Sequence, residues 1–375
     1  MNAAHLAEQA VLGCLMLPNQ QLTGVAASLR AEDFAHPWHQ EVFTTIRELH
    51  ASHQSHDARS VGPALLLRVG HRRADLPRIL DLLQATPIPP RPQRYAAMVL
   101  EESIRRTLAM QAVLLEAGAS AAAEVQSTGA VHRAALLVTG VLQDSELRWR
   151  GANTNPGLDA TPAESSRLVR KFDSALGADR LLRAHPPLDP EQVRLDEAHL
   201  VAALVVRPSH LARVSAWLRP EAVTDPAWRT VYAAAVHMAD SGLPIDVVTV
   251  TWEMRRTSQR LGAGPDTREL RMAVDAAAGS DPGFLSRRVA SDHLRLTAGR
   301  AAAALRTAAT NPGLDLVDVV ETGRIVTAAV LDAAAPLESV DGYTRQGHPG
   351  PARDRAVLPS AQPLGLVAGV AADAL

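Results

Sequence analysis

Apolar residues recur at helical spacing along most of the chain. A 4-3-4 spacing near the N-terminus predicts the buried side of a first helix, made by Leu6, Ala10, Gly13 and Leu17. Further on, a proline stands where the next helical pattern begins, and the apolar positions after it are expected to face inward: Pro37, then Val42, Phe43, Ile46 and Leu49. No run alternates apolar and polar residues with period two. We therefore expect an all-α fold.

The pattern occurs twice. When the sequence is shifted by 189 positions, so that Glu8 lies over Glu197, segments 8–61 and 197–250 align without a gap. Most matched positions are apolar and helically spaced, so the repeated feature is a folded core. Two of the identical pairs are Pro37/Pro226, predicted to begin helices, and Asp57/Asp246, predicted to cap them.

Each repeated unit, which we call a head, is followed by two longer amphipathic patterns. A break at 127–129 separates them in the first copy, and Asn311-Pro312-Gly313 separates them in the second. Two amphipathic helices joined by a short turn form a hairpin whose apolar side needs a partner. The predicted domains are copy 1 at 1–145 (head about 4–88, hairpin about 92–145) and copy 2 at 193–335 (head about 193–280, hairpin about 282–333).

The remaining segments are less regular. Residues 146–192 are predicted to form a linker, with room for one connecting helix at 165–182, and the Pro/Gly-punctuated tail 336–375 is predicted to be disordered. The hexapeptide TNPGLD occurs at 154–159 and again at 310–315. In the second copy it is the hairpin turn. In the first copy two interpretations stay open: a misplaced hairpin, or a turn segment copied into the linker.

The ordered motifs of the first copy resemble the N-terminal domain of DnaB-type replicative DNA helicases. They are Glu8-Gln9-Ala10-Val11-Leu12-Gly13, Leu29-Arg30-Ala31-Glu32-Asp33-Phe34, Pro37-Trp38-His39-Gln40-Glu41-Val42-Phe43 and Tyr95-Ala96-Ala97-Met98-Val99. The second copy is a weaker match, with Trp228 in place of His39 and Val223 in place of Phe34.

The resemblance implies a helical head followed by a hairpin. In the family this domain pairs with copies of itself around the helicase ring and helps to recruit primase. The ATPase motor follows the domain in the family, whereas here a second N-terminal-type copy follows the first.

Candidate chemistry is sparse. The sole lysine, Lys171, lies between Arg170 and Phe172 and so is not part of a phosphate-binding P-loop. The sole cysteine, Cys14, excludes an internal disulfide and falls within the predicted first helix, where a buried thiol is usual. No catalytic or cofactor-binding residue is assigned.

A histidine cluster is the one feature that suggests a metal. His50, His53 and His56 lie three residues apart with Asp57 adjacent, and His36 and His39 lie upstream. The second copy has Gly242, Ile245 and Asp246 at the positions of His53, His56 and Asp57, which favours a solvated loop. No metal site is therefore predicted.

Charge gives little support for nucleic-acid binding. Basic and acidic residues number 12 against 13 in 1–145, 7 against 7 in 146–192 and 16 against 16 in 193–335, whereas phosphate-tracking domains usually carry a basic excess. Three arginine strips are interpreted as solvated helix faces: Arg68/Arg72/Arg73, Arg255/Arg256/Arg260 and Arg287/Arg288/Arg295.

These observations predict a non-enzymatic, cytoplasmic interaction protein whose partners are a replicative helicase or primase. The apolar run 11–17 is too short to span a bilayer and follows no basic segment, so no membrane contact is expected. The two copies are expected to associate within one chain through their hairpins, at positions such as Leu108 and Leu142. The alternatives are a nucleic-acid-binding accessory protein that uses the arginine strips, and a helicase subunit whose motor is on another chain.

Overall fold

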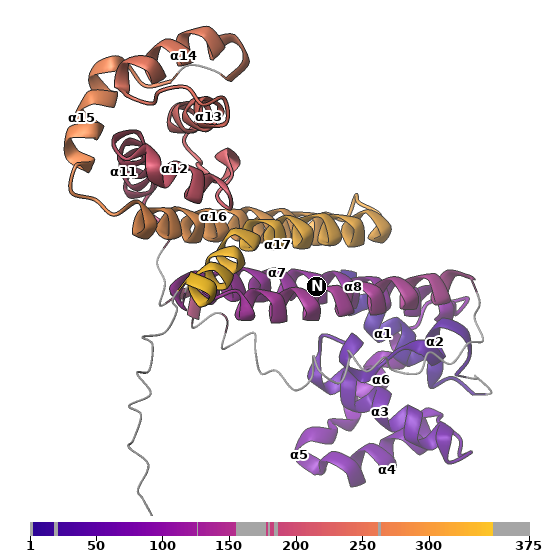
Figure 1. Ribbon diagram of the computed structural model, residues 1–375. Helices are drawn as coiled ribbons and strands as arrows, with labels where there is room; N and C mark the ends of the chain where they lie inside the picture. The colour runs from indigo at the N-terminus through magenta and orange to yellow at the C-terminus, as the bar shows by residue number, and fades with distance from the viewer. Residues whose placement is uncertain are drawn as a thin grey trace, which may run out of the picture.

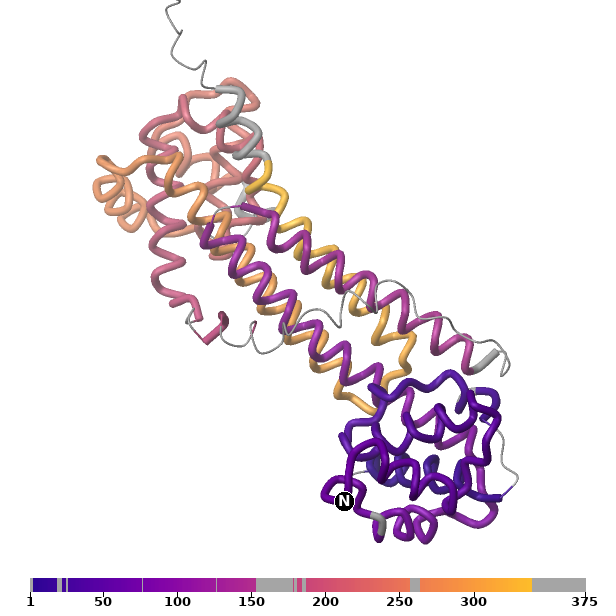
Figure 2. Tube along the Cα trace, turned by 90° about the horizontal axis from the view of Figure 1, so that it is seen from below, coloured from indigo at the N-terminus to yellow at the C-terminus, as the bar shows by residue number. Residues whose placement is uncertain are grey.

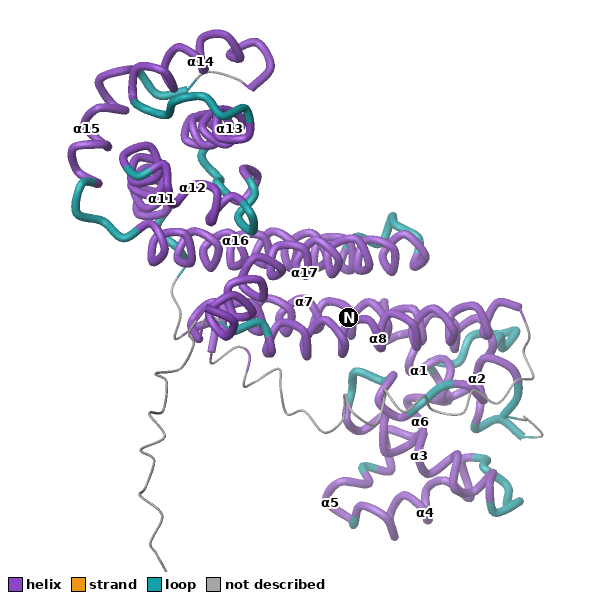
Figure 3. The backbone as a smooth tube through the Cα atoms, in the orientation of Figure 1, coloured by secondary structure: helices purple, strands orange, loops and turns teal. Residues whose placement is uncertain are grey.

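The computed structural model describes residues 3–18, 22–125, 127–154, 178, 181–183, 187–261 and 264–347. Every regular element in this part of the chain is a helix (Figures 1 and 3). The prediction of an all-α fold is confirmed.

Four long helices carry two compact heads. Head 1 contains α1 (Ala3–Leu15), α2 (Gly24–Ser28), η1 (Ala31–Asp33), α3 (Pro37–Ala51), α4 (Ala58–Val69), α5 (His71–Ala74) and α6 (Leu76–Gln84). Head 2 contains α11 (Pro190–Val206), α12 (Pro208–Ser215), η2 (Pro220–Ala222), α13 (Pro226–Asp240), α14 (Val247–Leu261) and α15 (Thr267–Ala277). The hairpins are α7 (Pro92–Val125) with α8 (Gly129–Thr154), and α16 (Pro282–Thr310) with α17 (Leu316–Gly347).

Helix starts follow the repeated sequence signals. Pro37 and Pro226 are the first residues of α3 and α13, as predicted. The carboxylate of Asp57 accepts a hydrogen bond from the Ser60 amide at 2.9 Å, and that of Asp246 accepts one from the Thr249 amide at 2.9 Å. Both predicted caps are therefore confirmed.

The predicted buried side of the first helix is wrong at both ends. Leu6 is 43% exposed, and α1 ends at Leu15, before Leu17. The reason is that α1 packs against α3, α6 and α7 together, so residues on several sides are buried and one seam does not describe it. Val11 and Leu12, which lie outside the predicted seam, are fully buried.

The two hairpins pack into one four-helix bundle. Helix α7 lies along α16, and α17 contacts both α7 and α8. Figure 2 shows the two heads at opposite ends of this bundle, so the hairpins, and not the heads, bring the copies together.

Both hairpins extend further than the sequence pattern indicated. Helix α8 reaches Thr154, inside the segment predicted as linker, and α17 continues through Pro336 to Gly347, inside the segment predicted as tail. The hexapeptide at 310–315 forms the predicted turn between α16 and α17. Residues 155–159 of the first hexapeptide, most of the predicted linker helix 165–182 and tail residues 348–375 lie outside the described residues.

Gly13 lets α1 approach the C-terminal part of α6 closely, which gives a test of the fold. A Cβ at this position would overlap the Leu82 carbonyl oxygen and the Thr86 hydroxyl. We expect Gly13→Ala to lower the free energy of unfolding by about 1–3 kcal/mol, because backbone must shift to make room. Gly299→Ala is the matched control, since its Cβ would meet only Glu116 Oε1 at 3.9 Å. That substitution should leave stability unchanged or raise it by up to about 1 kcal/mol. Urea denaturation followed by circular dichroism measures both, and equal stability of the two variants would contradict the described packing.

Candidate functional site

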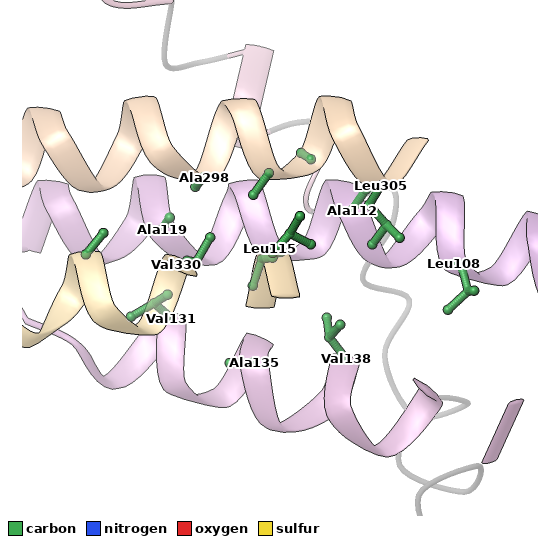
Figure 4. Close-up of a cluster of buried hydrophobic side chains, with 14 of the residues drawn as sticks. Leu108, Ala112, Leu115, Ala119, Val131, Ala135, Val138, Ala298, Leu305 and Val330 are labelled. Atoms are coloured by element: carbon green, nitrogen blue, oxygen red, sulfur yellow. The ribbon is translucent and has the colours of Figure 1, made fainter. Parts of the chain in front are cut away.

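The shared core of the two hairpins is the largest surface that joins the copies. Its buried side chains come from all four long helices, and Figure 4 labels Leu108, Ala112, Leu115, Ala119, Val131, Ala135, Val138, Ala298, Leu305 and Val330. Leu108 and Leu142, singled out from the sequence, are 0% and 1% exposed. A Cβ added at Gly323 of α17 would lie 2.5 Å from Leu142 Cδ2, so this glycine lets hairpin 2 approach hairpin 1 closely. Small and branched apolar side chains thus fill the space between the copies.

Arg105 on α7 holds the turn of the opposite hairpin. Its guanidinium donates hydrogen bonds to the carbonyl oxygens of Asn311 at 3.0 Å and Leu314 at 2.5 Å, both in the TNPGLD turn. Glu101, one turn earlier, accepts a further hydrogen bond from it at 2.8 Å. This turn lies 206 residues away in the chain and buries Arg105, so the local sequence pattern does not reveal the contact.

Polar contacts surround the apolar contact between the hairpins. Arg306 forms an ion pair with Glu116 at 3.4 Å, Arg324 forms one with Glu146, and His132 Nδ1 lies 3.1 Å from Glu338. Burial raises the pKa of Glu116, and Arg306 opposes this increase. These pairs are partly exposed, so they set register between the hairpins more than they add stability.

Head 1 is tied to its own hairpin by a buried carboxylate. Asp33 in η1 accepts hydrogen bonds from Arg148 Nη2 of α8 at 2.5 Å and from the Ser103 hydroxyl of α7 at 2.8 Å. The equivalent residue in head 2 is Ala222, so head 2 lacks this connection. The two copies therefore join head to hairpin in different ways.

A buried glutamate closes each head in the same manner. Glu8 accepts hydrogen bonds from the amides of Ala35 (2.5 Å) and His36 (3.4 Å), just before α3. Glu197 accepts them from the amides of Thr224 (2.6 Å) and Asp225 (2.8 Å), just before α13. Burial raises the pKa of Glu8, but hydrogen bonds from His39 and Ala35 outweigh it and hold that pKa below its usual value. The repeat alignment paired these glutamates but gave them no role.

The predicted loop histidines do not converge on one point. His56 is buried with Nδ1 2.9 Å from the Leu15 carbonyl oxygen, His53 is exposed with a φ of 54°, and Asp57 caps α4. Only the rings of His50 and His56 are close, with centroids 5.6 Å apart.

The structure instead gathers His36 and His39 with His5, which sequence spacing alone did not connect. Ring centroids of His5 and His39 are 5.0 Å apart, and those of His36 and His39 are 4.8 Å apart. Burial, together with the neighbouring His39, lowers the pKa of both His5 and His36.

Each arginine strip contains a residue engaged with a carboxylate. Arg68 Nε lies 2.9 Å from Glu41, Arg256 lies 3.4 Å from Glu253, and Arg288 lies 2.7 Å from Asp196. These arginines are therefore paired with carboxylates of the protein itself, which favours the interpretation of the strips as helix faces over their use as a nucleic-acid-binding surface.

Cys14 is fully buried, and burial raises the pKa of its thiol, as for an inert core cysteine.

Helix α7 has the length and composition of a membrane-spanning segment, but half of its most apolar stretch is buried against other helices. That burial is typical of the central helix of a bundle.

Asp292 on α16 provides a test through pH. Burial raises its pKa to about 6, Asp196 adds to the increase, Glu197 does so more weakly, and Arg288 and Arg295 oppose it. Asp292 therefore keeps its proton in the folded protein between pH 3.8, the ordinary pKa of the group, and about pH 6, whereas it loses the proton in the unfolded chain. Stability should fall as pH rises through this window and stay lower above it.

We expect Asp292→Asn to raise the free energy of unfolding at pH 7.5 by about 1–2 kcal/mol, a figure reduced for solvent screening of this partly exposed group. At pH 4 the substitution should have little effect. Urea denaturation at both pH values measures this, with the exposed Asp240→Asn as control. A stabilisation that is equal at the two pH values would contradict the assigned charge penalty.

Comparison with known proteins matches the same regions. The family described as DnaB-like helicase N terminal domain matches residues 1–101 and 189–276. The replicative DNA helicase DnaB of Mycobacterium leprae is 33% identical over 103 residues, 27% of this chain and 17% of that protein. The replicative DNA helicase DnaB of Rhodothermus marinus is 27% identical over 106 residues, 28% of this chain and 11% of that protein. The chain thus matches less than a fifth of the length of either relative.

A solved structure also matches. It is the crystal structure of the N-terminal domain of DnaB helicase from Mycobacterium tuberculosis, with 24% sequence identity and a TM-score of 0.32, covering 38% of this chain and 99% of that one. The family match falls on head 1 with the start of α7, and again on head 2, so it follows the repeat found in the sequence. The chain belongs to the DnaB-like helicase N-terminal domain family, and two segments of it match that domain.

Proposed function

We propose that this protein is a non-catalytic docking protein of the DNA replication machinery, which binds a replicative helicase or a primase. The observation that carries the proposal is the mutual burial of the two hairpins around Leu108 and Leu142. Family membership connects the chain with replicative helicases. We infer that in solution the copies stay associated within one chain, as an internal pseudo-dimer located in the cytoplasm.

The exposed parts of the heads supply chemistry for a partner. Head 2 presents Val248, Trp252 and Met272, which are 71%, 65% and 61% exposed. Large apolar side chains, tryptophan above all, are common anchors in protein interfaces. Because the bundle core is already filled by the second copy, we assign partner binding to the heads.

The absence of a motor motif supports a non-catalytic role. The sole lysine of the sequence lies outside any P-loop pattern, and the matched domain is the non-catalytic collar domain of the helicase.

The two alternative functions make different predictions. A nucleic-acid-binding protein would show tight, salt-dependent DNA affinity. A helicase subunit would co-purify with a separate ATPase.

Leu108→Asp tests the internal pseudo-dimer. A carboxylate placed at this fully buried position lacks a partner, so it should separate the hairpins. We expect a larger hydrodynamic radius by size-exclusion chromatography with light scattering, whereas Leu136→Asp, at a 73% exposed position of α8, should behave as wild type.

A protease site inserted at 155–162 makes this test independent of overall folding. After cleavage the two halves should co-elute in the wild type and in Leu136→Asp, and should separate in Leu108→Asp. Halves that separate in the wild type would overturn the pseudo-dimer.

Binding to purified helicase or primase from the same host tests the partner assignment. We expect isothermal titration to detect one of them, and Trp252→Ala to weaken that binding by about tenfold or more while circular dichroism stays unchanged. Leu136→Ala is the control, because Leu136 is a large apolar residue, 73% exposed, on α8 of the bundle and outside both heads. Steady-state ATPase assays of the protein alone should stay at background. Binding to neither protein, together with salt-dependent DNA binding, would favour the nucleic-acid alternative and refute the proposal.

A further inference from the structure

Three imidazoles and one carboxylate meet where α1 passes the beginning of α3. His5 and Glu8 are separated by one turn of α1, so they lie on one side of it. His39 faces them from the first turn of α3. One nitrogen or oxygen atom from each of these three residues lies within 4.8 Å of the other two.

The second copy fills the equivalent place differently. His5, His36 and His39 correspond to Arg194, Asp225 and Trp228. Arg194 Nε lies 3.3 Å from Asp225 Oδ2, so head 2 joins its first helix to the start of α13 with an ion pair. The glutamate alone is common to both copies. Head 1 has therefore kept the structural carboxylate and surrounds it with groups that offer nitrogen lone pairs.

We propose that His5, Glu8 and His39 bind a divalent transition-metal ion of the Zn²⁺ type, with water completing the coordination. Two imidazoles and one carboxylate form an established ligand combination for Zn²⁺, at bond lengths of about 2.0–2.2 Å. His5 is half-buried, so it is accessible to an incoming ion, whereas His39 is 1% exposed. Binding requires the His5 ring to rotate toward the other two donors. It also requires His39 Nδ1 and Glu8 Oε2, 2.6 Å apart, to separate slightly, because two ligands of one tetrahedral ion lie about 3.4 Å apart at these bond lengths.

Glu8 orients His39 by a direct contact. Its Oε2 lies 2.6 Å from His39 Nδ1, while its Oε1 accepts the Ala35 amide. Oε2 and Nδ1 are therefore already turned toward each other, and an ion bound between them would replace the hydrogen that they share. The ion would then connect the N-terminal end of α1 to α3, as the Arg194–Asp225 pair does in head 2.

Arg78 places a positive charge beside the proposed metal site, and this charge opposes the binding of a cation. Arg78 Nη2 lies 3.4 Å from His36 Nε2. His36 Nδ1 accepts the Trp38 amide, so Nε2 carries the hydrogen of the neutral ring and neither nitrogen offers a lone pair to an ion. We therefore leave His36 out of the ligand set. A guanidinium this close to a bound cation should weaken the binding, and its removal should strengthen it.

The test uses full-length, untagged protein stripped of metal by chelation. We expect isothermal titration with Zn²⁺ to give one ion per chain, and Co²⁺ to give the visible absorption of a tetrahedral site. Excess Zn²⁺ should raise the melting temperature, because the ion binds only the folded state. The double variant His5→Arg/His36→Asp installs the ion pair of head 2, so it should fold normally and bind Zn²⁺ at least about tenfold more weakly.

Two further variants separate this site from other histidines. Arg78→Gln should tighten Zn²⁺ binding, an effect opposite in sign to simple structural damage. His50→Ala/His53→Ala removes the loop histidines and should leave the affinity unchanged. If the His5→Arg/His36→Asp variant binds Zn²⁺ as well as the wild type does, or if the loop variant loses the binding, the proposed site is wrong.

Discussion

The mutual burial of two apolar hairpin faces is the contact on which the rest of the structure depends. Hydrophobic burial contributes roughly 25 cal/mol for each Å² removed from water, and neither hairpin can bury its apolar side by folding alone. Within the bundle, Leu108 and Val330 of different copies share one core. This arrangement directs the heads to opposite ends, because each head is joined to the beginning of its own hairpin.

Much of this architecture could be predicted from sequence because its signals are local or repeated. Pro37 and Asp57 act within one turn of their helices, and each has an identical counterpart in the second copy. The residues that could not be predicted depend on partners distant in the chain. Arg105 is buried because a turn from the other copy covers it. The pKa of Asp292 is raised because burial disfavours its charged form, and Asp196 adds to the increase.

The histidines show the same contrast between signals that are local in the sequence and contacts between distant segments. Histidines close in sequence, such as His53 and His56, point to different surroundings, while His5 and His39 meet across two helices. A spacing rule applied to one helix cannot identify such a group. In head 2 the residues at the positions of His5 and His36 are Arg194 and Asp225, and their ion pair shows that the same two helices meet at this place in both copies.

The placement of both hairpins in one chain has a consequence for stoichiometry. A pair built from two separate chains dissociates on dilution and exchanges partners with other copies. In the proposed internal pseudo-dimer the pairing is intramolecular, so its extent is independent of protein concentration. The two heads also differ, since one carries Asp33 and His39 where the other carries Ala222 and Trp228. Each molecule therefore presents one head of each kind, at any protein concentration.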